Sequence, residues 1–398
     1  MIGPNARTNA LPGYPLARIP SIKRRLIESG VDVIDLGAGD SDGLPPEGTR
    51  RALIDAMDRE PLHKYGFQQG NADFRRAACD WLSRRFGQKF DPTTEILPLI
   101  GSKEGLAHLA FAVVNPGDAV IVPEPGYQAY LGGAVLAGAE PVIIPLRAER
   151  KFLLELDDLD EKLLDRTALV YVNYPNNPTS AVAPRDYLER LVAGCRRHQI
   201  VLAYDNPYCD TTFDGYKAPS IFEIEGAREV AVEFFSMSKS FKMTGWRLGF
   251  AVGNPTLIGA LSKVKSYIDT GSFQALQAAA AWTLDNAESL VPSLVAELTE
   301  RRDAAVAALA GIGLPVQPPL ATMYLWIPLP AGVDSSRFAT HALEHEGVVV
   351  LPGAGFGAGG EGFFRIALTV SPGRLREAIA RLGRTLAACR DVETTTAG

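Results

Sequence analysis

Short apolar runs rich in β-branched residues alternate along this chain with longer segments of helical periodicity. The runs fall at residues 119–122, 141–144, 168–172 and 200–204. Such alternation predicts an α/β fold with a mainly parallel central sheet. Because ligands of these sheets bind beyond the carboxyl ends of the strands, the residues directly after each run are the first candidates for a site.

The size and composition of the chain indicate a globular protein with more than one domain. Its 398 residues exceed the length at which a single hydrophobic core stops growing. Hydrophobic residues make up 46% and charged residues 22%, which is ordinary for a globular enzyme. The formal charge of −6, with scattered basic residues, argues against nucleic acid as a partner.

The sequence also argues against a metal centre, secretion and a membrane. The four cysteines form no CxxC pair and no zinc-ligand spacing, so a reducing compartment fits best. The first 25 residues lack an apolar core of signal-peptide length, and the later apolar runs are too short for a membrane span. We therefore expect a cytoplasmic protein without a metal.

A lysine lies in a hydroxyl-rich loop after the apolar run at residues 230–235. A lysine amine forms an imine with an aldehyde, while hydroxyls and a guanidinium bind a phosphate dianion. Lys239, Ser236, Ser238 and Arg247 together are therefore a candidate site for a phosphorylated aldehyde. The alternative is that Lys239 is a solvated loop charge.

An aspartate and an amide follow two other strand-like runs. Asp205 and Tyr208 come directly after residues 200–204, and Asn177 lies between two prolines after residues 168–172. A carboxylate beside a pyridine nitrogen keeps that nitrogen protonated, while a phenol and an amide can bind a ring oxygen. The alternatives are an aspartate that caps a turn, a packed tyrosine and an ordinary Asn/Pro turn.

A turn of small residues, Gly101 to Gly105, opens the helix-like stretch that continues to Val114. Free backbone amides at a helix N-terminus form a phosphate site, which makes Ser102 and Lys103 candidates. Ser102 as a plain N-cap and Lys103 as a surface charge are the alternatives.

With these four loops in this order, the chain resembles the fold-type I, class I/II aminotransferases over nearly its whole length. The resemblance implies pyridoxal 5'-phosphate (PLP) as cofactor, with Lys239 as the imine-forming lysine and proton shuttle. It implies ring contacts from Asp205, Tyr208 and Asn177. The residues that it assigns to the phosphate are Ser102, Lys103, Ser236, Ser238 and Arg247.

The resemblance also covers residues outside these loops. Tyr127 matches an aromatic residue that stacks on the pyridine face, its alternative being a core aromatic. Tyr65 matches a tyrosine that reaches the phosphate of the neighbouring subunit, which implies a homodimer. Arg365 matches the arginine that binds the substrate α-carboxylate, a task suited to its forked guanidinium.

Within this family, the chain most resembles the LL-diaminopimelate aminotransferases, and the motifs that carry this resemblance lie at residues 11–16, 36–40, 100–106 and 352–357. Tyr14 and Gly39 fall at substrate-contacting positions of that group. Tyr267 stands where relatives often have asparagine, and Thr270 lies near a position that carries asparagine in some of them. These departures leave the donor, the acceptor and the recognition of a distal substrate group open.

The expected activity is transfer of an amino group between an amino acid and a 2-oxo acid, with LL-diaminopimelate and 2-oxoglutarate as one pair. Alternatives are an alanine- or aspartate-type aminotransferase and a PLP-dependent lyase, because the same lysine and aspartate serve all of these reactions. A PLP-binding regulatory protein is disfavoured, since no helix-turn-helix segment precedes Leu11.

The expected fold is a large PLP-binding domain, residues 49–284, around a mainly parallel sheet, with a smaller α/β domain. The smaller domain combines residues 19–48 with residues 285–390, after a helix-forming stretch that crosses between the two. Residues 1–18 contain prolines that favour an extended N-terminal arm, and residues 391–398 are expected to be a frayed tail.

Overall fold

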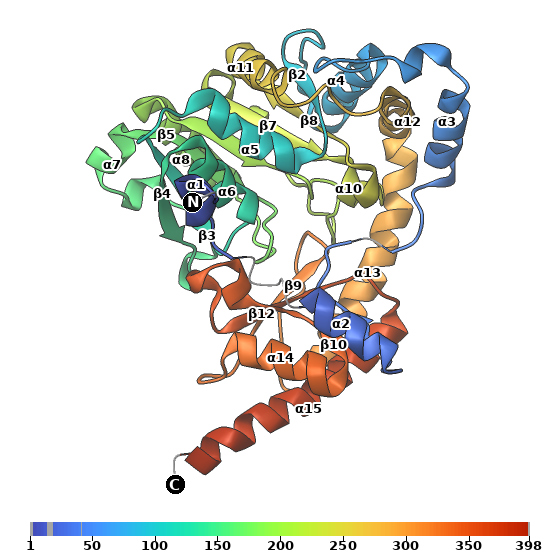
Figure 1. Cartoon of the computed structure of the whole chain (residues 1–398), viewed down its shortest axis with the longest axis vertical. Coiled ribbons are helices and arrows are strands. Elements are labelled where there is room, and N and C mark those ends of the chain that lie inside the picture. The colour runs from blue at the N-terminus through green and yellow to red at the C-terminus, as the bar shows by residue number, and fades with distance from the viewer. Residues whose placement is uncertain (1–2, 14–18, 41, 397–398) are drawn as a thin grey trace.

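The computed structural model describes residues 3–13, 19–40 and 42–396. Figure 1 shows an upper part with a large sheet and a lower part with smaller sheets, joined by the long helix α13 (Ala287–Gly311). None of the helices in these ranges combines the length and the apolar character needed to cross a bilayer.

A seven-stranded sheet forms the centre of the upper part. Strand β8 is antiparallel to both of its neighbours, and the remaining pairs are parallel. The four apolar runs are strands β3 to β6, which confirms the predicted α/β fold. In spatial order the strands are β2 (Ile96–Leu99), β8 (Gly249–Gly253), β7 (Ala231–Ser236), β6 (Val201–Asp205), β5 (Thr167–Asn173), β3 (Ala119–Glu124) and β4 (Glu140–Pro145).

Helices pack on both faces of this sheet, and alternate strand side chains enter two separate cores. In β5, Leu169 and Tyr171 lie in one core, while Val170 and Val172 lie in the other. Burial of both faces explains why β3, β5 and β6 read as continuous apolar runs. One face packs against α5 (Ser102–Val113), α6 (Gln128–Ala137) and α11 (Pro255–Lys265), and the other against α4 (Ala72–Phe86), α8 (Arg185–His198) and α12 (Gln274–Asp285).

Shorter elements complete the upper part. Helix α3 (Glu47–Met57) packs against α12, and α10 (Met237–Ser240) follows β7 directly. The other short helices are α7 (Glu161–Asp165) and α9 (Ala227–Val230). The 3₁₀ turns of the chain are η1 (Glu60–His63), η2 (Ala148–Arg150), η3 (Leu156–Asp158), η4 (Ile221–Glu223), η5 (Thr244–Trp246), η6 (Gly353–Phe356) and η7 (Ala358–Gly360).

The lower part has its own hydrophobic core, which includes segments from both ends of the chain. Its antiparallel sheet has the order β11-β12-β9, and β1 from the N-terminal segment pairs in parallel with β10. The strands are β1 (Ile34–Asp35), β9 (Tyr324–Pro328), β10 (Val348–Val349), β11 (Leu351–Pro352) and β12 (Phe363–Ala367), and the helices are α2 (Ile19–Glu28), α14 (Ser335–Glu346) and α15 (Pro372–Thr396).

The two ends of the chain differ from the expectation. The N-terminal arm is not wholly extended, because α1 (Ala6–Ala10) forms between Pro4 and Pro12, with Asn5 Oδ1 accepting the Thr8 amide at 2.9 Å. The prolines lie outside this helix and so do not interrupt it. At the other end α15 continues to Thr396, because each residue added to an existing helix gains a backbone hydrogen bond.

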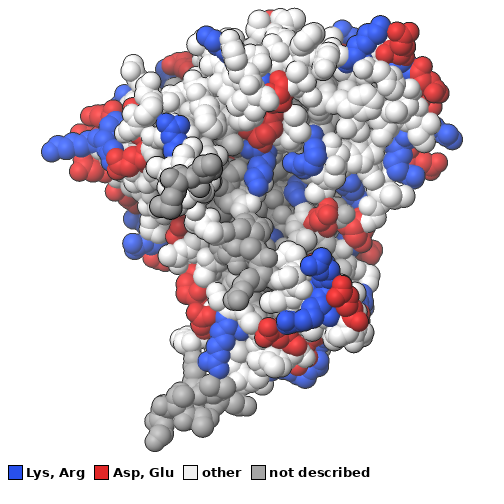
Figure 2. Space-filling view, in the orientation of Figure 1, with Lys and Arg blue, Asp and Glu red and all other residues white. Residues whose placement is uncertain are grey.

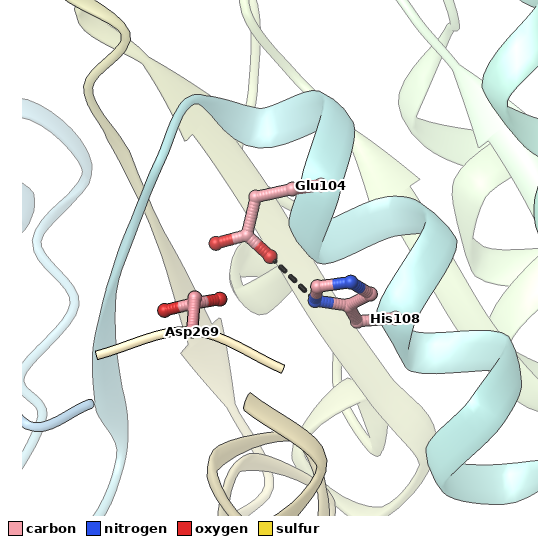
Figure 3. A group of neighbouring side chains, drawn as sticks. All are labelled: Glu104, His108 and Asp269. Atoms are coloured by element: carbon pink, nitrogen blue, oxygen red, sulfur yellow. Dashed lines mark ion pairs between the residues drawn. The ribbon is translucent and has the colours of Figure 1, made fainter. Parts of the chain in front are cut away.

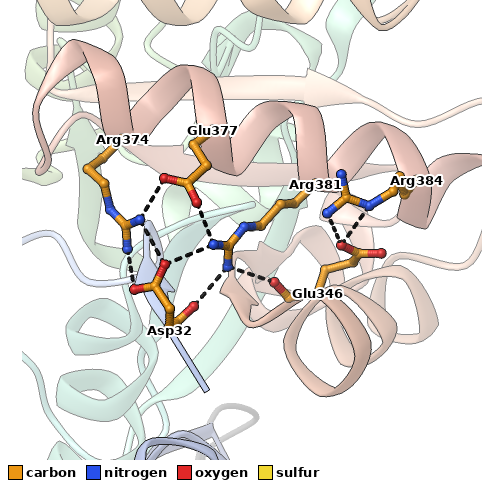
Figure 4. A network of polar contacts seen from close by, with 6 residues as sticks. All are labelled: Asp32, Glu346, Arg374, Glu377, Arg381 and Arg384. Carbon is orange, nitrogen blue, oxygen red and sulfur yellow. Dashed lines mark hydrogen bonds and ion pairs between the residues drawn. The ribbon is translucent and has the colours of Figure 1, made fainter. Parts of the chain in front are cut away.

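A charged network fastens α15 to the N-terminal part of the chain (Figure 4). Asp32 Oδ1 accepts a bond of 2.7 Å from Arg374 Nη2, and its Oδ2 accepts one of 2.8 Å from Arg381 Nη2. Arg381 Nη1 also donates to the Asp32 and Glu346 backbone carbonyls at 2.8 and 3.1 Å. The hydrogen bond from Arg374, followed by that from Arg381, lowers the pKa of Asp32 to about 2.

We expect Asp32→Asn to lower the melting temperature at neutral pH, because it removes the charge from two guanidinium bonds. The pKa of Asp32 is lower in the folded state than its ordinary value of 3.8, so its contribution is present above that value and is lost as the pH falls towards 2. The melting temperatures of the natural protein and of Asp32→Asn, measured from neutral to acidic pH, report this effect. A difference in melting temperature that does not shrink in acid contradicts the prediction.

Candidate active site

A cavity of about 470 Å³ lies between the two parts of the molecule. Asn173, Asp205 and Ser236, the last residues of β5, β6 and β7, line one side of it, and Tyr324 and Arg365 of the smaller sheets line the other. On the face shown in Figure 2 the molecule is hollowed between its upper and lower parts, with Lys and Arg side chains around the hollow. The cavity therefore lies beyond the carboxyl ends of the strands, as expected for this type of sheet.

The structure brings most of the predicted site residues together at this cavity. Tyr65 does not line it, because its side chain lies on the surface and is 75% exposed. Tyr14 lies outside the described residues. Those that line the cavity are Gly39, Ser102, Lys103, Tyr127, Asn177, Asp205, Tyr208, Ser236, Ser238, Lys239, Arg247 and Arg365.

Asp205 is a buried carboxyl with unused bonding capacity. The Tyr130 hydroxyl donates to its Oδ2 at 2.6 Å, but Oδ1 has no hydrogen-bond partner among the described residues. Burial raises the pKa of Asp205 to about 7, and the bond from Tyr130 only partly opposes this. A cationic N–H donor in the cavity would satisfy Oδ1 and stabilise the ionised form, and a protonated pyridine nitrogen is such a donor.

Lys239 lies in the short helix α10 directly after β7, and its amine donates to the Gly39 carbonyl oxygen. A Cβ atom on Gly39 would lie 2.2 Å from the Tyr324 hydroxyl, so only glycine fits at this approach. Burial acts to raise the pKa of Tyr324, but the positive charges of Lys239 and Arg365 lower it overall. The Tyr208 hydroxyl donates to that of Tyr324 at 3.3 Å. These contacts join Lys239 to the smaller sheet across the cavity.

Arg365 is a buried guanidinium held between two aromatic rings. Its Cζ lies 4.1 Å from the ring centroid of Tyr324 and 4.9 Å from that of Phe356. Nη1 donates to Asn177 Oδ1 and Nη2 to the Gly37 carbonyl, each at 2.7 Å. Stacked and bonded in this way, the guanidinium has a fixed orientation at the cavity wall, where it can bind a carboxylate.

Positive charge and free backbone amides gather at the other end of the cavity. The N-terminus of α5 points there with Ser102 and Lys103, and the Arg247 side chain lies over Gly101, so closely that a Cβ atom on Gly101 would be 2.4 Å from Nη2. Burial and then the Arg247 charge lower the pKa of Lys103. Hydroxyls of Ser236 and Ser238 line the same cavity. This donor set suits a phosphate dianion.

Sequence reasoning missed several residues that hold the site in place. Tyr130 and Tyr324 are uncharged and lie within apolar elements, so no local pattern distinguishes them from core residues. Asn173 fixes the Asn177 backbone by accepting its amide at 2.7 Å, and its Nδ2 donates to the Asp205 carbonyl at 2.8 Å. A detectable signal existed for Phe356, which falls in the Pro-Gly-Ala-Gly-Phe-Gly segment that carries the family resemblance.

Comparisons with known proteins agree with this geometry. The family described as aminotransferase class I and II matches residues 31–382. LL-diaminopimelate aminotransferase 2 of Trichormus variabilis is 44% identical over 377 residues, which are 94% of this chain and 97% of that protein. Among solved structures, substrate-bound BacF from Bacillus subtilis has a TM-score of 0.93 at 33% identity, covering 97% of this chain and 98% of that one. A probable N-succinyldiaminopimelate aminotransferase from Thermus thermophilus has a TM-score of 0.89 at 38% identity, covering 94% and 100%.

The mostly parallel sheet covered by helices on both faces, together with the similar solved structures, defines an α/β protein of the fold-type I aminotransferase class. The chain belongs to the class I and II aminotransferase family, and it is an aminotransferase.

Proposed function

We propose that this aminotransferase uses PLP to move the amino group of LL-diaminopimelate to 2-oxoglutarate. The observation that supports PLP as the cofactor is the buried Asp205 carboxyl. It lines the cavity, and one of its oxygens has no hydrogen-bond partner among the described residues. The observation that supports the substrate is the similarity, over nearly the whole chain, to proteins named LL-diaminopimelate aminotransferase.

The residues around the cavity fit PLP from one end to the other. Asp205 would hold the pyridine nitrogen, Tyr208 and Asn177 the ring oxygen, and Tyr127 the ring face. When bound, PLP supplies an electron sink that stabilises negative charge at the substrate α-carbon. The residues that would hold the phosphate are Ser102, Lys103, Ser236, Ser238 and Arg247.

Two residues would act directly on the substrate. Arg365 would bind the α-carboxylate through its fixed guanidinium, which sets the orientation of the α-carbon. Lys239 would take and return the α-proton, because its side chain lines the cavity from α10, directly after β7. Tyr208 follows β6 on one side of the cavity, and its hydroxyl donates to that of Tyr324 on the other side.

A substrate with a charged distal end fits a second feature of the cavity. Lys23 Nζ and Asp35 Oδ2 form an ion pair of 2.6 Å in the lower part of the molecule, and both side chains line the cavity. Asp35 is fixed in turn by the Gly37 amide, which donates to its Oδ1 at 2.8 Å. LL-diaminopimelate carries a second ammonium and a second carboxylate, and this pair offers one charge of each sign.

We further propose that the protein is a cytoplasmic homodimer in which Tyr65 reaches the neighbouring active site. The rings of Tyr65 and Phe67 lie 5.9 Å apart between centroids, and the two side chains are 75% and 60% exposed. Clustered exposed aromatic and aliphatic residues mark an interaction surface. The cytoplasmic location is supported by Cys79, Cys195 and Cys209, which are buried and form no disulfide among the described residues.

A panel of amino donors with 2-oxoglutarate as acceptor tests the proposed reaction. We expect LL-diaminopimelate to exceed alanine and aspartate in kcat/KM by on the order of a hundredfold, because a site that pairs distal charges rejects donors that lack them. Higher rates with alanine or aspartate would show that the substrate is wrong while leaving the reaction class intact. Pyruvate and ammonia from a cysteine-type donor would indicate a lyase, and a purified protein that binds no PLP would exclude the cofactor.

A further inference from the structure

A fully buried lysine lies outside the cavity and has no part in the proposed reaction. Lys265, the last residue of α11, has 0% exposure, and its ammonium donates to Glu104 Oε1 and to both Asp269 oxygens, the latter at 3.1 and 3.0 Å. A buried ammonium is costly unless it is paired and hydrogen-bonded. Two carboxylates from segments far apart in the sequence provide that pairing here.

Glu104, His108 and Asp269 converge at this point, as Figure 3 shows. Their potential ligand atoms lie within 4.8 Å of one another, and Glu104 Oε2 pairs with His108 Nδ1 at 2.8 Å. The group has the residue types of a metal site, but the Lys265 ammonium already contacts both carboxylates. The cation of this cluster is therefore the lysine, and the cluster is an ion-pair network.

One arm of the network reaches the proposed phosphate end of the cavity. Glu104 is the third residue of α5, and the Oε1 atom that binds Lys265 also accepts the Ile100 amide at 3.0 Å. Ile100 and Gly101 form the turn that leads into Ser102 and Lys103, which line the cavity. The position of the Glu104 carboxylate thus sets the position of this turn.

The other arm reaches the segment that carries Tyr65. Asp269 Oδ1 accepts the Gly271 amide at 2.7 Å. Gly271 lies so close to residue 67 that a Cβ atom on it would be 2.5 Å from the Phe67 carbonyl oxygen. The Gln274 side chain then donates to the Lys64 carbonyl at 2.9 Å. Asp269 therefore holds Gly271 against the backbone that follows Tyr65, and Gln274 in the next helix bonds the backbone that precedes it.

We propose that Lys265 is a positioning residue for the cofactor phosphate, which joins the phosphate-binding turn at residues 100–103 to the Tyr65 segment. The proposal rests on PLP as the cofactor. Without the ammonium, two carboxylates whose side chains are only 17% exposed would face each other, and their repulsion would displace Glu104 and the turn that it holds. The affinity for a ligand with a phosphate would fall, while the affinity for the same ring without a phosphate would change little.

Binding of PLP and of pyridoxal to the cofactor-free protein separates these effects. For Lys265→Met we expect the Kd of PLP to rise roughly tenfold and the Kd of pyridoxal to stay unchanged. A roughly tenfold loss of affinity is the low end of what is lost at metal sites when a residue that supports a ligand is replaced. The ³¹P NMR shift of bound PLP should also move. Lys263→Met, an exposed lysine on the same helix, is the matched control and should bind both ligands like the natural protein.

An equal loss of affinity for PLP and pyridoxal, or an unmoved ³¹P shift, would overturn the proposal and leave Lys265 with a structural role alone. A natural protein that does not prefer PLP to pyridoxal would instead refute the proposed cofactor. If Lys265→Met does not fold, Asp269→Asn gives the same comparison, because it weakens one arm while it keeps an acceptor for the Gly271 amide.

Discussion

Lys239→Ala is expected to lower kcat for amino transfer by at least about 10⁴-fold, because it removes the amine that we propose carries the α-proton. The folded structure should persist, since the Lys239 side chain has one hydrogen bond described, to the Gly39 carbonyl. Single-turnover rates with LL-diaminopimelate, measured with PLP in excess, report the chemical step apart from cofactor loss.

Lys242→Ala is the control for this experiment, because Lys242 lies in the same loop but does not line the cavity. Its ammonium pairs with Glu297 at 2.7 Å, so its loss should reduce stability and leave most of the activity. In Lys239→Ala, an added small amine should partly restore transfer of the α-proton. Turnover near that of the natural protein in Lys239→Ala would refute the assigned role.

The sequence allowed the central sheet and the strand-end residues to be predicted, for one physical reason. Strands β3, β5 and β6 are almost wholly buried, and the edge strand β4 is partly exposed but still apolar, so all four read as continuous apolar runs. Parallel strands also bring their carboxyl ends to one edge. Of the candidates, Asp205 is the last residue of β6, Asn177 follows β5 and Lys239 follows β7. Their convergence on one cavity follows from the topology alone.

The supporting contacts could not be predicted, because they join segments that only the folded chain brings together. Tyr130 reaches Asp205 from the interior of an apolar helix, where a buried tyrosine looks like any other core residue. Lys265 meets Glu104 across 161 positions of sequence, and neither position carries a local signal. Specific tertiary packing determines such contacts, and hydrophobic periodicity does not record it.

Asp205→Asn is expected to have opposite effects on activity and on the stability of the cofactor-free protein. The amide cannot hold the pyridine nitrogen in its protonated form, so we expect kcat to fall by on the order of 10²–10³-fold, as when one preorganised electrostatic contact is removed from an active site. At the same time the substitution removes a buried carboxyl whose ionisation is unfavourable without the cofactor.

The direction of the stability change follows from the pKa of Asp205. Burial raises the folded-state pKa to about 7 from an ordinary value of 3.8, with the Tyr130 bond opposing the shift. The folded protein therefore loses stability as the pH rises through this range, because the unfolded chain ionises Asp205 more readily. Asn at this position does not titrate, so the variant should gain about 3 kcal/mol relative to the natural protein between pH 5 and pH 8.

Urea unfolding of the cofactor-free proteins at the two pH values measures this gain, and kcat with saturating PLP measures the loss of activity. Asp210→Asn is the control, since Asp210 is also buried but does not line the cavity and pairs with Arg85 at 2.9 Å. Asp210→Asn should destabilise the protein at both pH values, because the substitution leaves the Arg85 guanidinium without its anion. If Asp205→Asn keeps kcat within tenfold of the natural enzyme, Asp205 is not the partner of the pyridine nitrogen. If it shows no relative gain in stability at the higher pH, burial does not raise the pKa of Asp205.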